Sequence, residues 1–379
     1  MKGAPFQPLK TSYDALVACD PVSDHDRVLF PSFSSLTTIL KLQKSDDIPK
    51  LPKAKVDINL TGEWTVNLEG LRFLLETTAE NDMIIFATDA NLRRLSACDT
   101  VYMDGTFKAC PKLYSQLFTI HGLHNGYVVP LVFVLLSSKK SDAYYKLFNK
   151  LRDAIAANGE ILNPKLIVTD FESGLIDAIK KQFPNALHLG CLFHYTQAVW
   201  RHVQAYGLVR SFRKEAEIGK FIKLMMALEF VPEDEVIDQA ERCLNDLTQE
   251  GRQKLDEFIL YFWSTWLNSM FEIKIWNKYG QDFLHRTNNR VESWHATLKD
   301  KLPLHPNIYR LINALKVQDA TTRLTLAKAD AGEAPAKRKP RYVTLEHDLQ
   351  SLYQAHVKKQ ISTTELLERA RHCVRRKLW

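Results

Sequence analysis

The 379-residue sequence lacks several features that mark particular classes of protein, and each absence argues against one class. Its six cysteines form no Cys-x-x-Cys pair, so neither a disulfide framework nor a cysteine-rich zinc module is indicated. No apolar run approaches the roughly 20 residues that a membrane helix needs. The opening stretch MKGAPFQPLKTSYDALV has no apolar core of a secretory signal. Internal repeats and long low-complexity segments are also missing, and we expect a folded protein of a reducing compartment without a membrane partner.

Positive charge is in moderate excess and is unevenly distributed. The formal net charge is +7, with 45% hydrophobic and 25% charged residues, as expected of a folded soluble protein. From Glu333 to Trp379, 11 Lys or Arg residues accompany 5 Asp or Glu residues. A basic tail indicates that the protein binds a polyanion or carries a nuclear import signal. A solvated helical surface explains the same charge equally well. Lys337-Arg338-Lys339-Pro340-Arg341 fits an import signal, hence a nuclear location, as well as it fits a basic linker.

A block of alternating strands and helices follows residue 98. Asn125-Gly126 between two apolar runs is a strong hairpin signal. The predicted order is β-β-β-α-β-α-β-α, which indicates a mixed sheet with helices on its faces. This order matches the α/β ribonuclease H-like fold, in which the first strand is central and the fourth lies beside it. The segments are DTVYMDGTFKA, YSQLFTIHGL, YVVPLVFVLLS, SDAYYKLFNKLRDAIAANG, KLIVTD, ESGLIDAIKKQF, NALHLG and CLFHYTQAVWRHV.

The remaining sequence surrounds this block with helical segments. We expect short amphipathic helices at GEWTVNLEGLRFLL and ATDANLRRLSACD, an all-helical insertion before the last core helix, and a helical C-terminal extension. The predicted divisions are an N-terminal lead-in at 1–95, the first part of the core at 96–206, the helical insertion at 207–285, the second part of the core at 286–330, a basic linker at 331–342 and a basic helical tail at 343–379.

Three carboxylates stand out by their positions. Asp104 lies within the first predicted strand, Asp170 ends the fourth, and Glu292 lies in the first turn of a later helix. Each has a plainer interpretation. Asp104-Gly105 resembles a hairpin turn, and both Thr169-x-x-Glu172 and Asn289-x-x-Glu292 have capping-box spacing. Because the better hairpin is at Asn125-Gly126, we place Asp104 in the middle of its strand.

Carboxylates from separate elements suit metal-dependent phosphodiester chemistry. Mg²⁺ prefers carboxylate oxygens, and two such ions about 3.5–4 Å apart can clamp an in-line displacement at phosphorus. In the predicted fold, Asp104 and Asp170 lie side by side, and the last helix brings Glu292 over the same edge of the sheet.

Several of these segments together resemble the transposase domain of Mutator-like elements, the MULE domain, across about residues 60–310. The similar blocks are GEWTVNLEGLRFLL, FATDANLRRL, DTVYMDGTFKACPKLYSQLFTIHG, LIVTDFESGLIDAI, GCLFHYTQAVWRH and TNNRVESWHATLK. The resemblance implies a DDE-type transposase with Asp104, Asp170 and Glu292 as the triad that binds two Mg²⁺ or Mn²⁺ ions. Its reactions would be hydrolysis at the ends of a double-stranded DNA element and strand transfer to target DNA, by a homo-oligomer assembled on DNA. The similar animal lineage often carries an N-terminal FLYWCH zinc finger, for which Cys19 and Cys98 supply no set of ligands.

The resemblance also covers Cys191 and His194, the Cys-x-x-His pair that follows the second aspartate. As a zinc pair they lack two partners at usable spacing, unless the fold gathers His188, His202 or His295. We favour a supporting or structural role beside the triad, although the spacing alone fits an ordinary buried thiol with a helix-face histidine about as well.

Contacts with DNA would be made through phosphates. Lys108, Arg286, Arg290 and Lys299 lie near the carboxylates in sequence and are the candidate contacts. Four tryptophans could stack on bases, although helical apolar stripes favour core positions for most of them. They are Trp200, Trp263, Trp266 and Trp294.

Three functions compete at this point. The first is an active transposase, which the intact set of carboxylates favours. The second is a domesticated or truncated DNA-binding protein that no longer cuts, which the absence of a finger favours. The third is a nuclease acting on RNA–DNA hybrids, against which the helical insertion argues.

Overall fold

The apolar runs after position 98 form the centre of a seven-stranded mixed sheet in a computed structural model of the chain. The structure describes residues 49–268, 271–282, 288–337 and 339–374. The strand order is β1-β2-β5-β4-β3-β6-β7, with parallel pairs β3–β6 and β6–β7 and antiparallel pairs elsewhere. The strands are β1 Leu74–Thr77, β2 Met83–Phe86, β3 Thr100–Thr106, β4 Gln116–His124, β5 Tyr127–Leu136, β6 Leu166–Thr169 and β7 Leu187–Gly190.

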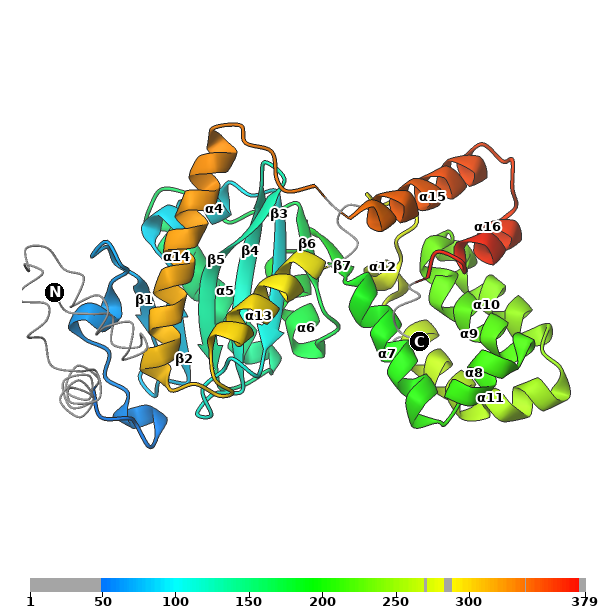
Figure 1. The fold of residues 1–379 in the computed structure, drawn as a ribbon, viewed down its shortest axis with the longest axis horizontal. Coiled ribbons are helices and arrows are strands. Elements are labelled where there is room, and N and C mark those ends of the chain that lie inside the picture. The colour runs from blue at the N-terminus through cyan, green and yellow to red at the C-terminus, as the bar shows by residue number, and fades with distance from the viewer. Residues whose placement is uncertain (1–48, 269–270, 283–287, 338, 375–379) are drawn as a thin grey trace, which may run out of the picture.

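Helices account for most of the other described residues. Those around the sheet are α4 Asp89–Ser96, α5 Ser141–Ala156, α6 Ser173–Gln182, α13 Asn289–Lys301 and α14 Ile308–Asp330. Those of the helical lobe are α7 Leu192–Ala205, α8 Val209–Lys214, α9 Ala216–Ala227, α10 Val236–Asn245, α11 Gln249–Phe262, α12 Ile273–Trp276, α15 Pro340–Val357 and α16 Thr363–Ala370. Figure 1 shows the two regions side by side, with α7 leading from the sheet into the helical lobe.

The predicted order of strands and helices after residue 98 is confirmed, from β3 through α7. β3 lies between β4 and β6, so the fourth predicted strand does pair with the first. The hairpin at Asn125-Gly126 is also confirmed, and both residues have positive φ, at 46° and 81°. These are the conformations that a two-residue hairpin loop requires.

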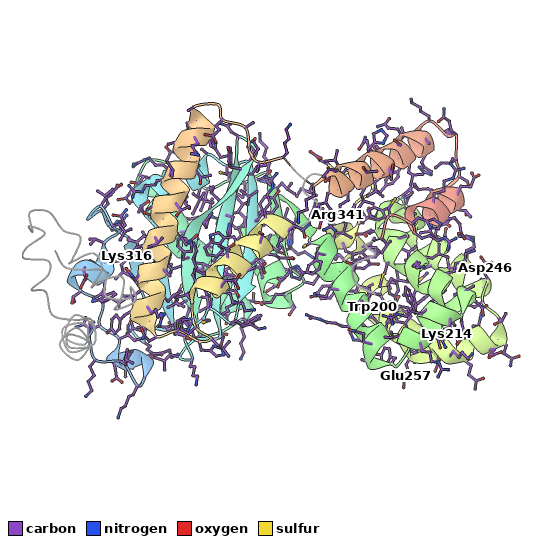
Figure 2. All side chains as sticks on the ribbon, viewed as in Figure 1. Trp200, Lys214, Asp246, Glu257, Lys316 and Arg341 are labelled. Carbon is purple, nitrogen blue, oxygen red and sulfur yellow. The ribbon has the colours of Figure 1, made fainter. Side chains whose placement is uncertain are left out.

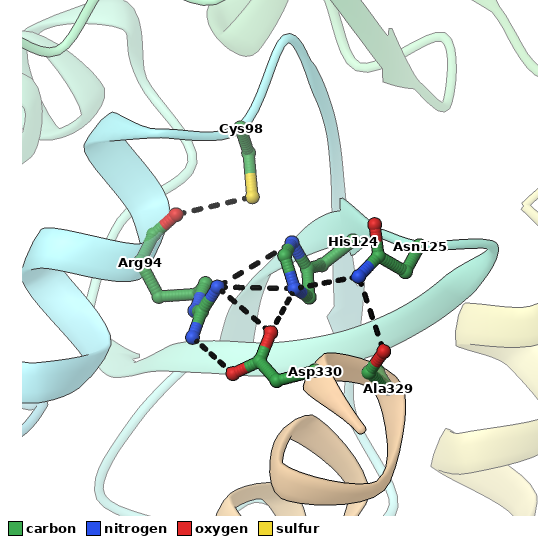
Figure 3. A network of polar contacts seen from close by, with 6 residues as sticks. All are labelled: Arg94, Cys98, His124, Asn125, Ala329 and Asp330. Atoms are coloured by element: carbon green, nitrogen blue, oxygen red, sulfur yellow. Dashed lines mark hydrogen bonds and ion pairs between the residues drawn. The ribbon is translucent and has the colours of Figure 1, made fainter. Parts of the chain in front are cut away.

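Polar contacts tie this hairpin to the end of α14 (Figure 3). Nε2 of His124 lies 2.6 Å from Oδ1 of Asp330, and Nη2 of Arg94 lies 2.8 Å from the other oxygen of that carboxylate. The side chain of Asn125 donates to the carbonyl of Ala329 at 3.2 Å. The turn is therefore held by α4 and α14 together, although neither follows it directly in the chain.

Helices cover both faces of the sheet. One face packs against α4, α5 and α6 in an apolar cluster that includes Val101, Met103, Phe118 and Ile120. The other face packs against α13 and α14, mainly through strands β2 and β5. In Figure 1 these last two helices cross the sheet in front of the strands.

The helical lobe has a core of its own. Trp200 of α7 is buried there with residues from α8 to α12. Figure 2 shows Lys214, Asp246 and Glu257, which are exposed, on the helices around this core. The predicted tail is helical and packs on the same core, because Leu349 of α15 and Leu367 of α16 are buried in it. In the described part of the chain, we find no helix with both the length and the apolar character to span a membrane.

The predicted helix at residues 62–75 is wrong. Only Gly62–Thr65 form a turn of 3-10 helix, and the segment then enters β1. The side-chain oxygen of Asn67 accepts hydrogen bonds from the backbone N–H groups of Glu69 and Leu71, and Gly70 adopts φ of 78°. This local turn reverses the chain, so the apolar residues that follow pair with β2 rather than continue a helix.

Candidate active site

Asp104 occupies the middle of β3, opposite Thr119 of β4. The ladder continues to Gly105 and Thr106, so the alternative of a hairpin turn at Asp104-Gly105 is wrong. The carboxylate is buried, and its Oδ1 accepts a hydrogen bond from the N–H of Gly105 at 2.9 Å. A Cβ at position 105 would overlap the carboxamide of Gln116, so any larger residue there would have to displace that side chain.

Asp170 follows the last residue of β6. The parallel ladder pairs Tyr102 with Val168, and the same register extended by two residues sets Asp170 beside Asp104. Burial raises the pKa of Asp170 to about 6, with a further contribution from the charge of Asp104. The two carboxylates therefore interact, and removal from water makes their mutual repulsion stronger. Thr169 does not cap the next helix, whose N-cap is Glu172.

Glu292 lies in the first turn of α13. Val291 beside it packs against Tyr102 and Val168, which carries this turn over the strands that hold the two aspartates. The helix begins at Asn289 after an N-cap at Asn288, so the capping box proposed for Asn289 is wrong.

Cys191 and His194 meet Glu292 at the start of α7. Candidate ligand atoms of the three side chains all lie within 4.8 Å of one another, and Nε2 of His194 is 3.8 Å from Oε1 of Glu292. The N–H of Asn288 donates to Sγ of Cys191 at 3.2 Å, across 97 residues of sequence. Burial alone would lower the pKa of His194, but Cys191 and the nearby carboxylates Asp104 and Asp170 outweigh it and raise that pKa.

A buried polar chain lies behind Asp104, and the sequence analysis missed it. Nδ1 of His295 is 3.5 Å from Oδ2 of Asp104, and its Nε2 is 3.0 Å from the hydroxyl of Thr119. Nε2 of His121 lies 3.0 Å from the same hydroxyl. Burial, with the charge of His295 second, lowers the pKa of His121 well below its usual value. Polar residues at alternate positions of β4, where an apolar strand was expected, were the available signal.

The helical lobe reaches this site through Lys278. Its ammonium group is buried and donates to the carbonyl of Gly190 at 2.6 Å, directly before Cys191. Burial lowers the pKa of Lys278 to about 8, against the opposing charge of Glu229. A buried ammonium group needs hydrogen-bond acceptors in place of water. The hydrogen bond from Lys278 to Gly190 meets this need and fixes the end of β7.

The structure separates the other predicted zinc partners from Cys191 and His194. The ring of His188 lies 2.8 Å from the hydroxyl of Thr169, and His202 stacks on Tyr261 with ring centroids 3.5 Å apart. His295 turns toward Asp104 instead.

The candidate DNA contacts are dispersed around the site. Lys108 lies just beyond the end of β3 and Lys299 in the last turn of α13, and both are exposed. Arg290 is exposed and donates to the carbonyl of Gly126 in the hairpin. Arg286 lies outside the described residues.

The tryptophans occupy core positions, as their helical stripes predicted. Trp200 and Trp266 are buried in the helical lobe, and Trp263 packs against the same core. Trp294 stacks on Phe133 with ring centroids 5.7 Å apart, and its indole N–H donates to Gln318.

The donor chemistry of the aspartate pair fits a hard divalent cation. Both groups are oxygen ligands. Burial raises the pKa of Asp170 most and the charge of Asp104 raises it further, and a cation between the carboxylates would relieve that second contribution.

Comparison with known families gives a match over part of the chain. Residues 100–198, from the start of β3 into α7, match the model of the MULE transposase domain. The matched range contains Asp104, Asp170, Cys191 and His194, and it ends before Glu292. No curated protein matches the chain.

Proposed function

Since the chain carries a MULE transposase domain at residues 100–198, we propose that it is a DDE-type transposase that cleaves and joins DNA. The observation that carries this proposal is the pair of interacting carboxylates, Asp104 on β3 and Asp170 directly after the neighbouring parallel strand β6. A central β3 flanked by β4 and β6 supports the ribonuclease H-like reading of the core.

Asp104, Asp170 and Glu292 are the proposed ligands of two Mg²⁺ or Mn²⁺ ions. When bound, such ions activate an attacking oxygen and stabilise the leaving oxygen at phosphorus. The protein's own contribution is rigidity. Gly105 and His295 hold the carboxylate of Asp104 from two sides, and the packing of Val291 on the strands supports the first turn of α13.

Double-stranded DNA is the proposed substrate, bound through its phosphates. The net charge of +7 and the exposed Lys108, Arg290 and Lys299, which lie near the carboxylates in sequence, support this part of the proposal. A nuclear location and assembly as a homo-oligomer on DNA follow from the same reaction and are part of the proposal.

A second candidate is a domesticated or truncated DNA-binding protein without cutting activity. It is favoured by the position of Glu292, which lies beside His194 and Cys191, and by a family match that ends before Glu292.

The deciding experiment is Mg²⁺- or Mn²⁺-dependent nicking and strand transfer by the full chain on the DNA that flanks its gene. We expect activity in the wild type and only background in Asp104→Asn and Asp170→Asn, because each change removes an anionic oxygen ligand. Asp153→Asn, an exposed carboxylate on α5, is the matched control and should cut at the wild-type rate.

Wild-type cutting by Asp170→Asn would remove that residue from the proposed site. Salt-dependent DNA binding by the wild type with no cutting in either metal would favour the second candidate.

A further inference from the structure

A second group of possible ligands adjoins the aspartate pair, and its chemistry differs. Cys191 offers a sulfur, His194 a ring nitrogen and Glu292 a carboxylate oxygen, all within 4.8 Å of one another. The ligand atoms of a tetrahedral zinc site lie about 3.3–3.6 Å apart when the metal–ligand distances are about 2.0–2.3 Å. The 3.8 Å between His194 and Glu292 is close to that spacing, so small side-chain rotations would complete it.

The donor set selects the class of metal. Mg²⁺ binds oxygen almost exclusively, whereas thiolate and imidazole ligands favour Zn²⁺ and related transition metals. A bound metal displaces the protons of Cys191 and His194, because only the thiolate and the neutral imidazole are ligands. With Glu292 ionised, the ligand charges then balance a divalent ion. Three protein ligands leave a fourth position for water.

The backbone holds this group in place before any metal arrives. Cys191 is the N-cap of α7 and its N–H bonds the carbonyl of Thr169 at 2.7 Å, so the cysteine is fixed to the end of β6. His194 follows in the first turn of α7. The N–H of Asn288 donates to the sulfur and thereby joins the start of α13 to the same point. Such supporting hydrogen bonds are what orient the ligands of protein metal sites.

The group is also reachable. Cys191 is fully buried, but the side chains of His194 and Glu292 are 25% and 26% exposed. The group is therefore approached from the side of the histidine and the glutamate, and because Nδ1 of His194 and Oε1 of Glu292 are themselves buried, entry of an ion needs a rotation of these side chains.

We propose that Cys191, His194 and Glu292 form a binding site for Zn²⁺ or a similar transition metal. The site shares Glu292 with the proposed Mg²⁺ ligands, so zinc bound there would withdraw this carboxylate from the aspartate pair. Zinc binding stands independently of the proposed function, whereas inhibition of cutting by zinc rests on it.

Co²⁺ titration of the chelator-treated, reduced full chain tests the site directly. A thiolate bound to Co²⁺ gives a sulfur-to-metal charge-transfer band, and tetrahedral coordination gives intense visible absorption. We expect one equivalent to bind and one equivalent of Zn²⁺ to displace it. Cys191→Ser should abolish the charge-transfer band, and Glu292→Gln should weaken binding roughly tenfold or more.

The matched control is Cys373→Ser, which changes another cysteine outside the group and should leave the band intact. Circular dichroism of each variant shows whether a lost band reflects lost folding, and the more conservative Glu292→Gln keeps the test decisive if Cys191→Ser unfolds. An undiminished band in folded Cys191→Ser, or no Co²⁺ binding by the wild type, would overturn the proposal.

Zinc inhibition of Mg²⁺-dependent cutting separates the two proposals. Zinc should inhibit the wild type at lower concentration than it inhibits Cys191→Ser, each compared with its own zinc-free rate. Cobalt binding without any cutting would uphold the zinc site and contradict the transposase. Cutting without cobalt binding would do the reverse.

Discussion

The two faces of strands β3 and β4 bury opposite kinds of side chain. Toward α4, α5 and α6 the strands present Val101, Met103, Phe118 and Ile120, all in one apolar cluster. Toward α13 they present Tyr102, Asp104, Thr119 and His121, which are equally buried. One strand pair therefore supplies both the core and the candidate site, because successive side chains of a strand point to opposite faces.

The difference shows how the two faces are stabilised. Apolar burial is non-directional and tolerates many arrangements, so the first face needs only volume and pattern. Buried polar groups need partners with defined geometry, so the second face depends on His295 and other residues brought from distant parts of the chain. Stability should therefore depend mainly on the first face and chemistry on the second.

The largest effect on stability should come from the apolar face. Leu147 of α5 is fully buried in its cluster, and Leu147→Ala should lower the free energy of unfolding by about 2–5 kcal/mol through lost burial and a cavity. The same substitution at Leu260 of α11, which is 63% exposed, should cost about 0.5 kcal/mol or less. Urea unfolding followed by circular dichroism measures both. Equal costs at the two sites would contradict this assignment of the core.

An intermediate effect is expected where α14 meets the N-terminal segments. The buried carboxylate of Asp319 accepts from the amide groups of Asn67 at 3.0 Å and Asn91 at 2.8 Å. Asp319→Ala leaves both amides unpaired and should cost about 1–3 kcal/mol in the same unfolding assay. The exposed Asp153 is the control, and Asp153→Ala should be neutral. A neutral Asp319→Ala would mean that water replaces the carboxylate.

The smallest effect should be a change in how the stability of the metal-free protein depends on pH. The pKa of Asp170 is raised from 3.8 to about 6 in the folded protein. Between pH 3.8 and about 6, Asp170 is therefore protonated in the folded state and ionised in the unfolded state. This group's contribution to stability is therefore lost as pH rises from about 4 to about 6. Asp104→Asn removes the neighbouring charge and should reduce that loss, without lowering stability near pH 7. Thermal unfolding in the presence of a chelator, from pH 4 to 7, measures it.

An unchanged pH profile in Asp104→Asn would mean that burial alone raises the pKa of Asp170. The same result would weaken the case that the two carboxylates act as one pair.

Local sequence determined the part of the fold that carries the aspartates. Apolar runs of strand length specified β3, β4 and β5, and Asn125-Gly126 specified the turn between the last two, because few residues adopt positive φ at low cost. The parallel pairing of β3 with β6 followed from the order of elements, and it set Asp170 beside Asp104.

Prediction from local sequence was wrong where a short apolar stretch is compatible with both a helix and a strand. The apolar residues of 62–75 fit a helical stripe. In the structure the chain turns at Asn67, and the residues after the turn pair with the edge of β2 as strand β1. The stretch with helical periodicity is short, and a helix there would be less favourable than pairing of its last residues with β2.

What the sequence by itself determined was the short apolar runs that form the strands, the turn between β4 and β5, and the presence of carboxylate, thiol and imidazole groups. Which of these groups meet was decided only by the tertiary structure. Glu292 reaches Cys191 and His194, and His295 reaches Asp104, because α13 returns to the sheet after the long helical segment that follows α7. Contacts of this kind depend on how whole helices pack, and no pattern of neighbouring residues encodes them.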